Sequence, residues 1–211
     1  MGAELKIKVC GMRDPANIRE VVKFKPDLLG FIFYPRSKRY LGSPDPAVFR
    51  EIPYGIRKVG VYVNETVESI KQMVADLGLD MVQLHGNETP DDCRNIARSG
   101  ISVIKAFGIS GSINNERLRE YSGSCEYFLF DTGSAAFGGT GQKFDWHVLE
   151  EYKLTKPFFL SGGIGPEDLP SILDLDHPDL AGIDINSRFE TEPGIKDAAK
   201  VRDFVQSIRR K

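Results

Sequence analysis

Eight short apolar runs, spaced steadily along the chain, are the feature that most limits what this sequence can fold into. Several are rich in Val, Ile and Phe and lack clean alternation of apolar and polar residues, which is typical of parallel strands buried on both faces. The runs are Leu5–Cys10, Leu28–Phe33, Lys58–Val63, Asp80–Leu84, Ser102–Phe107, Tyr127–Asp131, Pro157–Leu160 and Ala181–Ile185. We therefore predict eight strands in one parallel sheet.

Helix signals lie between most of these runs. Asp14 is followed by Pro15, a pairing typical of a helix start. A second helix is predicted to begin at Asn64, as its N-cap, and to end at Gly78. Further helices are predicted within residues 88–100, 165–175 and 193–211, and a weaker one within 45–53.

Repeated strand–helix alternation of this kind predicts an α/β fold, a single-domain (β/α)8 TIM barrel over residues 1–211. A doubly wound open sheet alternates in the same way and is the alternative. The number of strands and the absence of a G-x-G-x-x-G motif after the first of them favour the barrel. The chain has 211 residues, close to the lower limit of about 200 for this fold, which leaves little room for another domain.

The composition restricts the class of function. The chain is 41% apolar and 27% charged, with a formal net charge of -2, so no overall field favours nucleic acid or an anionic membrane. No leader pattern opens the sequence, and no apolar run is long enough to span a membrane. We expect a cytoplasmic protein and, because no long apolar stripe demands a partner, a monomer.

Cysteine and histidine usage gives no sign of a disulfide framework or a metal site. The three cysteines, Cys10, Cys93 and Cys125, are an odd number at wide spacing, and none belongs to a C-x-x-C pair. The three histidines are scattered singly. We therefore expect no metal, and we interpret Cys93 and Cys125 as structural.

In a barrel, the carboxyl ends of the strands and the loops after them form the active face. Two late loops there are rich in glycine: residues 138–141 after the sixth strand, and residues 161–165 after the seventh, which leads into a helix. Glycine lets backbone N–H groups approach an anion, and a helix start adds its dipole. The pair predicts a phosphate site, although either loop alone could be an ordinary turn.

Two strand ends carry groups suited to acid–base chemistry. Cys10 closes the first strand; a buried cysteine is often only a small hydrophobe, but a thiolate here could act as a base if its pKa were lowered. Asp131 closes the sixth strand, either as a turn cap or as an acid or base at the pocket.

Arg39 lies in a basic loop and could bind a substrate carboxylate through two hydrogen bonds. For His85 we expect a hydrogen bond to the backbone.

Seven segments occur in an order that resembles one known family, from Lys8 to the last helix. They are KVCG, GFIFYPRSKRY, VGVYVNE, VQLHG, FDTG…GGTGQKFDW, LSGGI and DINSRFETEPGIKD. Together they resemble phosphoribosylanthranilate isomerase of tryptophan biosynthesis. The resemblance implies a barrel that converts N-(5-phospho-β-D-ribosyl)anthranilate to 1-(2-carboxyphenylamino)-1-deoxy-D-ribulose 5-phosphate by an Amadori rearrangement.

The resemblance also implies roles for individual residues. Cys10 matches the general base, Asp131 the general acid, and Arg39 the group that holds the anthranilate carboxylate. His85 and Asp184 are expected among the substrate-binding residues. The phosphate-binding loops contain Gly141, Gly162, Gly163, Asn186 and Ser187.

The implied chemistry needs no cofactor. A neutral Asp131 gives a proton to the ring oxygen, and a thiolate at Cys10 removes the C2 hydrogen of the open Schiff base, which acts as its own electron sink.

A ribulose-phosphate epimerase would need a metal-binding His and Asp set, which the sequence does not offer. A two-substrate relative that also acts in histidine synthesis would need a second phosphate loop in the first half of the barrel. A phosphate-ligand binder without catalysis remains the alternative outside enzymes.

Overall fold

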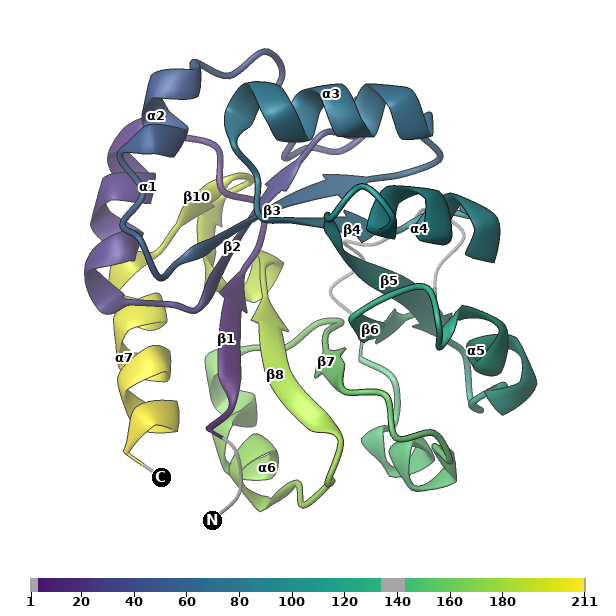
Figure 1. Ribbon diagram of the computed structural model, residues 1–211. Coiled ribbons are helices and arrows are strands. Elements are labelled where there is room, and N and C mark those ends of the chain that lie inside the picture. Colours follow the sequence, from purple (N-terminus) through teal and green to yellow (C-terminus); the bar gives the residue numbers. More distant parts are fainter. Residues whose placement is uncertain (1–3, 134–142, 211) are drawn as a thin grey trace.

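The computed structural model describes residues 4–133 and 143–210. Eight parallel strands form a closed barrel in chain order, and the last strand pairs with the first from Lys6↔Gly182 to Val9↔Ile185. The strands are β1 (Lys6–Val9), β2 (Leu28–Ile32), β3 (Arg57–Tyr62), β4 (Met81–Leu84), β5 (Ser102–Ile109), β6 (Tyr127–Thr132), β7 (Phe158–Leu160) and β8 (Leu180–Ile185). The closed ring, seen in Figure 1, confirms the barrel and excludes the open sheet.

Helices surround the barrel. The α-helices are α1 (Pro15–Val21), α2 (Pro46–Arg50), α3 (Val67–Leu77), α4 (Pro90–Ala97), α5 (Asn115–Tyr121), α6 (Leu169–Asp174) and α7 (Ala198–Arg209). Short 3-10 helices are η1 (Val22–Phe24), η2 (Trp146–Glu151), η3 (Pro166–Asp168) and η4 (Ser187–Phe189), and a two-stranded hairpin follows β8, formed by β9 (Glu190–Glu192) and β10 (Ile195–Lys196). The helix α5, the segment η2 and this hairpin were not predicted from the sequence.

The predicted cap of α3 is wrong by two residues. Thr66 is the N-cap, with its side chain accepting a hydrogen bond from the backbone N–H of Ser69. Asn64 instead has a φ of 53°, a conformation that Asn tolerates better than most residues, and its side chain accepts from the N–H of Asn87 at 2.7 Å. The predicted end of the helix at Gly78, with a φ of 60°, is confirmed.

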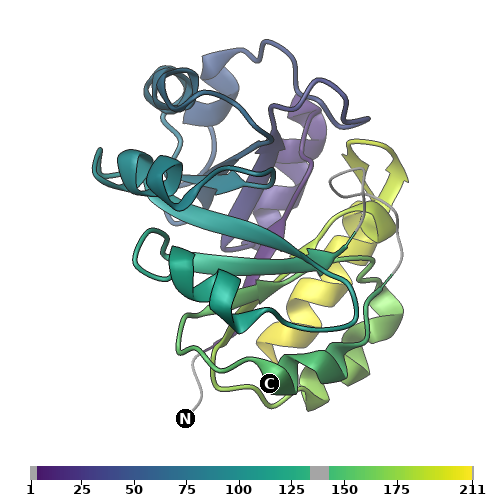
Figure 2. The ribbon, with the colours of Figure 1, turned by 90° about the vertical axis from the view of Figure 1, so that its right-hand side faces the viewer.

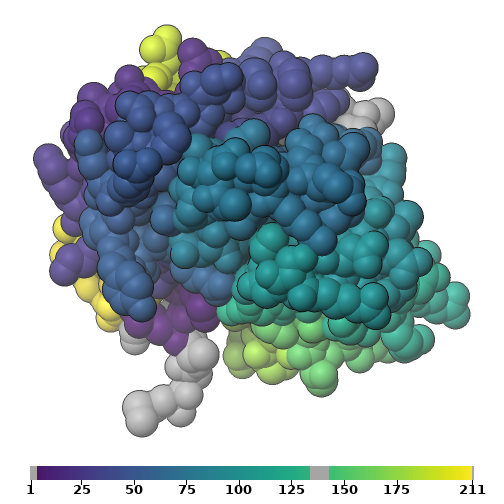
Figure 3. All heavy atoms as spheres, turned by 45° about the horizontal axis from the view of Figure 1, so that its top comes forward, coloured from purple at the N-terminus to yellow at the C-terminus, as the bar shows by residue number. Residues whose placement is uncertain are grey.

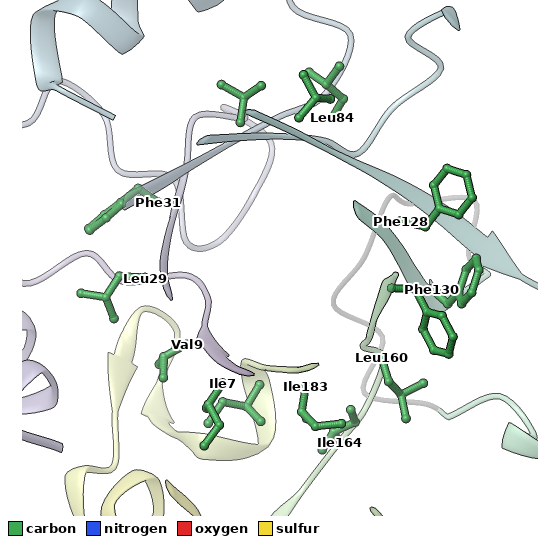
Figure 4. Close-up of a cluster of buried hydrophobic side chains, with 14 of the residues drawn as sticks. Ile7, Val9, Leu29, Phe31, Leu84, Phe128, Phe130, Leu160, Ile164 and Ile183 are labelled. Atoms are coloured by element: carbon green, nitrogen blue, oxygen red, sulfur yellow. The ribbon is translucent and has the colours of Figure 1, made fainter. Parts of the chain in front are cut away.

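The core has two layers, one on each side of the barrel wall. The outer layer lies between the strands and the helices, and Figure 4 shows its labelled side chains, such as Ile7, Val9 and Phe31, pointing away from the barrel axis. The inner layer fills the barrel with Leu28, Val59, Met81, Ile104, Ala106, Leu129 and Phe159. Since side chains alternate along a strand, Ile7 and Val9 facing outward direct Lys8 and Cys10 inward.

The last helix completes the outer ring. It packs against both α1 and α6, as the views in Figures 1 and 2 show. On the face drawn in Figure 3, the blue and teal atoms of the segment that runs from α2 to α4 form the front of the molecule. Within the described ranges, no helix is long and apolar enough to cross a membrane.

Candidate active site

A cavity of about 560 Å³ opens at the carboxyl ends of the strands. It brings together six of the residues singled out from the sequence: Cys10, Arg39, His85, Asp131, Asp184 and Asn186. These residues are spread along the chain from position 10 to position 186, and the parallel barrel places their strand ends at one mouth.

Cys10 is almost completely buried at the floor of this cavity, with 4% of its surface exposed. Gly30 on the neighbouring strand makes room for it, because a Cβ at Gly30 would lie 2.7 Å from Cys10 Sγ. Burial raises the pKa of the Cys10 thiol, although the ammonium groups of Lys8 and Lys196 pull it down. The condition set from the sequence for a thiolate base, a lowered pKa, is therefore not met by Cys10 in the substrate-free protein, because desolvation outweighs the two cations.

Lys8 and Asp184 form a buried ion pair beside this thiol. Lys8 Nζ lies 2.9 Å from Asp184 Oδ1, and Ser161 Oγ donates to Asp184 Oδ2 at 3.3 Å. Burial alone lowers the pKa of Lys8, but the Asp184 carboxylate and the Cys10 side chain outweigh burial and hold the pKa above its ordinary value. Asp184, expected to bind substrate, thus has both carboxylate oxygens engaged by protein groups.

Asp131 is held by two donors. The N–H of Thr132 donates to Asp131 Oδ1 at 2.8 Å, and His85 Nε2 lies 3.2 Å from Asp131 Oδ2. The other ring nitrogen, His85 Nδ1, lies 2.8 Å from Gln83 Nε2. The expected bond from His85 to the backbone is wrong, because Gln83, His85 and Asp131 all point into the barrel and form a chain of side chains instead.

Arg39 reaches the cavity from the loop after β2, and its guanidinium binds Glu190. Its Nε lies 2.8 and 3.0 Å from the two carboxylate oxygens, and its Nη2 lies 2.6 Å from Oε2. Lys196 Nζ donates to Glu190 Oε1 at 2.7 Å and to Asn186 Oδ1 at 2.7 Å. Glu190 and Lys196 lie on the unpredicted hairpin, and neither was singled out from the sequence.

The glycine loop after β7 adopts the backbone that only glycine favours. Gly162 and Gly163 have φ values of 92° and 66°, and a Cβ at Gly162 would lie 2.4 Å from Thr132 Oγ1. Gly162, Gly163 and Ser187 do not line the cavity themselves. Gly162 follows Ser161 and Ser187 follows Asn186, and both Ser161 and Asn186 line it. Gly141 lies outside the described residues.

The sequence analysis did not single out Lys8, Glu190 or Lys196 as site residues. Of these three, only Lys8 carried a signal in the sequence. A lysine within an apolar strand is costly to bury without a partner, so its presence there pointed to a nearby carboxylate. No such signal marked Glu190 or Lys196. Across residues 4–133 and 143–210, no group of three or more His, Cys, Asp or Glu side chains is arranged to hold a metal ion.

Comparison with known proteins gives one consistent result. Residues 7–207 match the family model described as N-(5'phosphoribosyl)anthranilate (PRA) isomerase. The chain is 49% identical over 205 residues to N-(5'-phosphoribosyl)anthranilate isomerase of Parabacteroides distasonis, covering 96% of this chain and 92% of that protein.

Solved structures agree with the sequence match. One is a crystal structure of phosphoribosyl anthranilate isomerase in complex with reduced 1-(o-carboxyphenylamino)-1-deoxyribulose 5-phosphate, with a TM-score of 0.79, 32% identity, and 98% of this chain and 100% of that chain covered. Another shows monomers of the dimeric enzyme from Thermotoga maritima, with a TM-score of 0.80, 31% identity and the same coverage.

Proposed function

Because the chain belongs to the N-(5'-phosphoribosyl)anthranilate isomerase family, we propose that Cys10 and Asp131 are the catalytic pair of its isomerase reaction. The reaction converts N-(5-phospho-β-D-ribosyl)anthranilate to 1-(2-carboxyphenylamino)-1-deoxy-D-ribulose 5-phosphate, a step of tryptophan biosynthesis. The observation that carries the assignment is that the thiol directly after β1 and a carboxyl group on β6 line one cavity. A phosphosugar lying between them has an acid on one side and a base on the other.

Asp131 is the general acid in this proposal. Its proton passes to the ring oxygen, the furanose opens, and the nitrogen lone pair forms a protonated Schiff base at C1. The carboxylate left behind is stabilised by the N–H of Thr132 at Oδ1 and by His85 at Oδ2. These two contacts are in place before the reaction, so no side chain has to move to receive the charge.

Cys10 is the general base. Its thiolate removes the proton at C2, and the electron pair moves into the Schiff base to give an enolamine. The ketone forms when C1 gains a proton and the hydroxyl on C2 loses one. Burial disfavours the thiolate, while Lys8 and Lys196 favour it, so these two ammonium groups support the base at the moment when it must be charged.

Substrate binding is assigned to three groups of residues. Arg39 takes the anthranilate carboxylate, and His85 and Asp184 face the sugar. Gly141, Gly162, Gly163, Asn186 and Ser187 bind the phosphate through backbone groups. The left-handed conformation of Gly162 and Gly163 supports this, because successive N–H groups in such turns converge on an anion.

The Schiff base withdraws the electrons that the reaction releases at C2, so we propose catalysis without a metal or organic cofactor. The test is the decay of the fluorescence of the phosphoribosyl adduct of anthranilate, in metal-free buffer with purified protein. Turnover there supports the whole proposal. Tight binding without decay would instead make the protein a ligand binder.

We also propose that residues 1–211 form a single domain that acts as a monomer in the cytoplasm. Among the described residues, the large apolar side chains that stand exposed are Tyr40 and Tyr54, which is too little for an apolar interface. The Thermotoga maritima relative is a dimer, so the question is open to experiment. Light scattering should give a mass near 23.5 kDa, and twice that mass would refute the monomer.

A further inference from the structure

We propose that Glu190 is a positioning residue for the carboxylate subsite: it holds one edge of the Arg39 guanidinium so that the other edge receives the carboxylate of the substrate. The inference rests on the function proposed above and deepens it. Arg39 and the catalytic pair follow from the family, whereas Glu190 is assigned from the contacts in this structure alone.

The contacts between the two side chains use one edge of the guanidinium. Nε and Nη2 of Arg39 bind the Glu190 carboxylate at 2.6 to 3.0 Å. A guanidinium is planar and carries its five N–H donors in a fixed fork. When the Nε edge is occupied, the edge formed by Nη1 and the second Nη2 proton is left for another carboxylate, and Arg39 lines the catalytic cavity.

Glu190 is itself fixed by donors other than Arg39. Lys196 Nζ donates to its Oε1 at 2.7 Å, and the N–H of Gly194 donates to the same oxygen at 3.1 Å. Lys196 is anchored in turn, because its backbone N–H and C=O both bind the Asn17 side chain on α1, at 2.8 and 2.9 Å. Glu190 is therefore part of a rigid support and not a mobile group that leaves when substrate arrives.

With Lys196 protonated, the charges in this cluster leave an excess of one positive charge; burial lowers the pKa of Lys196, and the Glu190 carboxylate offsets only part of that effect. Arg39 and Lys196 are two cations around one carboxylate, Glu190, while the nearby Asp184 is paired with Lys8. Burial alone raises the pKa of Glu190, but the hydrogen bonds from Arg39 and Lys196 bring it below its ordinary value, so Glu190 stays ionised. One buried carboxylate thus orients Arg39 without cancelling the charge that attracts a second carboxylate.

The position of Arg39 also sets the distance between the subsite and the base. Gly11 follows Cys10, and a Cβ at Gly11 would lie 2.7 Å from Arg39 Cδ and 2.7 Å from Asn186 Oδ1. The Arg39 stem therefore lies directly against the backbone that carries the thiol. By fixing the guanidinium, Glu190 positions the aromatic ring of the substrate. The ring is joined to the sugar through nitrogen, so its position also sets where the hydrogen on C2 of the sugar lies relative to Cys10.

The test compares two ligands that differ only in the carboxylate. One is the reduced product, 1-(2-carboxyphenylamino)-1-deoxyribitol 5-phosphate, and the other is its counterpart made from aniline. Dissociation constants are measured by calorimetry for wild type, for Glu190→Gln and for Glu192→Gln. The last is the matched control, since Glu192 is exposed on the same strand β9.

We expect Glu190→Gln to bind the carboxylated ligand about tenfold more weakly, the loss expected when a charge-assisted hydrogen bond is misplaced. Affinity for the aniline ligand should stay within about twofold, and Glu192→Gln should match wild type with both ligands. Equal losses for both ligands would show a merely structural role and overturn the inference. Unchanged or tighter binding of the carboxylated ligand would overturn it as well, the latter because Glu190 would then compete with substrate.

A second measurement covers the case in which Glu190→Gln does not fold. Glu190→Asp keeps the charge but is too short to hold the fork, and it should show the same ligand-dependent loss. In an Arg39→Ala background, Glu190→Asp should cause no further loss, because Glu190 acts through Arg39. Absence of turnover by wild type would refute the proposed function, whereas turnover by wild type with full affinity in the Glu190 variants would refute only this inference.

Discussion

Cys10 directly follows β1 and lies two residues after Lys8, so the alternation of side chains points both into the barrel. The same spacing places Gln83 and His85 together on the inner side of the fourth strand end. The side chains next to these groups matter for their chemistry. The ammonium group of Lys8 acts on the Cys10 thiol, and the imidazole of His85 lies beside the Asp131 carboxyl group. Each group is of the chemical type that its proposed role requires, and its neighbours supply the charges and hydrogen-bond donors around it.

Removal of either proposed catalytic group should abolish most of the activity. Cys10→Ala and Asp131→Asn should each lower kcat by about a hundredfold to ten-thousandfold, the usual contribution of a general acid or base. Both should fold, because each change keeps the volume of the side chain nearly constant or reduces it only slightly. Steady-state fluorescence kinetics and circular dichroism check these expectations.

A rate close to that of wild type in either variant would remove that residue from the mechanism. The matched control is Cys93→Ala, which changes a buried cysteine on α4 that lies outside the catalytic cavity. It should keep its kcat within about threefold of wild type, provided that it folds.

At the scale of single elements, local sequence predicted every α-helix of the described residues except α5, and it misplaced the start of α3. The α3 helix starts at Thr66 and not at Asn64, because Asn64 is needed in a left-handed turn that binds Asn87. The β9–β10 hairpin gave no clear strand pattern, being only three and two residues long. Its formation depends on contacts with α1 and with Arg39, which are distant in sequence.

The assignment of the α3 cap leads to a stability prediction. Thr66→Ala should lower the free energy of unfolding by about 1 kcal/mol, because the backbone N–H of Ser69 loses its acceptor. Ser69→Ala is the matched control: it removes a hydroxyl from the same exposed turn and should be neutral or slightly stabilising. Urea unfolding of the three proteins gives the comparison, and equal midpoints for Thr66→Ala and wild type would contradict the assignment.

At the scale of the whole molecule, three buried thiols make stability sensitive to high pH. Burial raises the pKa of Cys93 and of Cys125 to about 12 and raises that of Cys10 as well. The unfolded chain releases these protons near the ordinary thiol pKa of about 8.5, while the folded chain retains them. The stabilisation is therefore complete below that pH and is lost as the pH rises toward the folded pKa values.

We expect the free energy of unfolding to fall by about 2 kcal/mol for each of Cys93 and Cys125 between about pH 8.5 and pH 10. Urea titrations at these two pH values measure the loss. Cys125→Ala removes one titrating thiol, so its loss should be smaller than that of wild type by the same amount. Identical losses for the two proteins would show that Cys125 does not titrate as its burial indicates.

The sequence by itself determined the eight strands, the barrel, and which strand-end residues point inward, because these depend on local periodicity and on the fixed alternation of side chains. Only the tertiary structure decided the partners: Lys8 with Asp184, His85 with Asp131, and Arg39 with Glu190. These pairs join residues far apart in the chain, and no local pattern encodes which two will meet. Closure of the barrel decides two of the pairs, because it brings β8 beside β1 and places the hairpin after β8 against the loop that carries Arg39. The third pair forms because the ends of β4 and β6 meet at the same mouth.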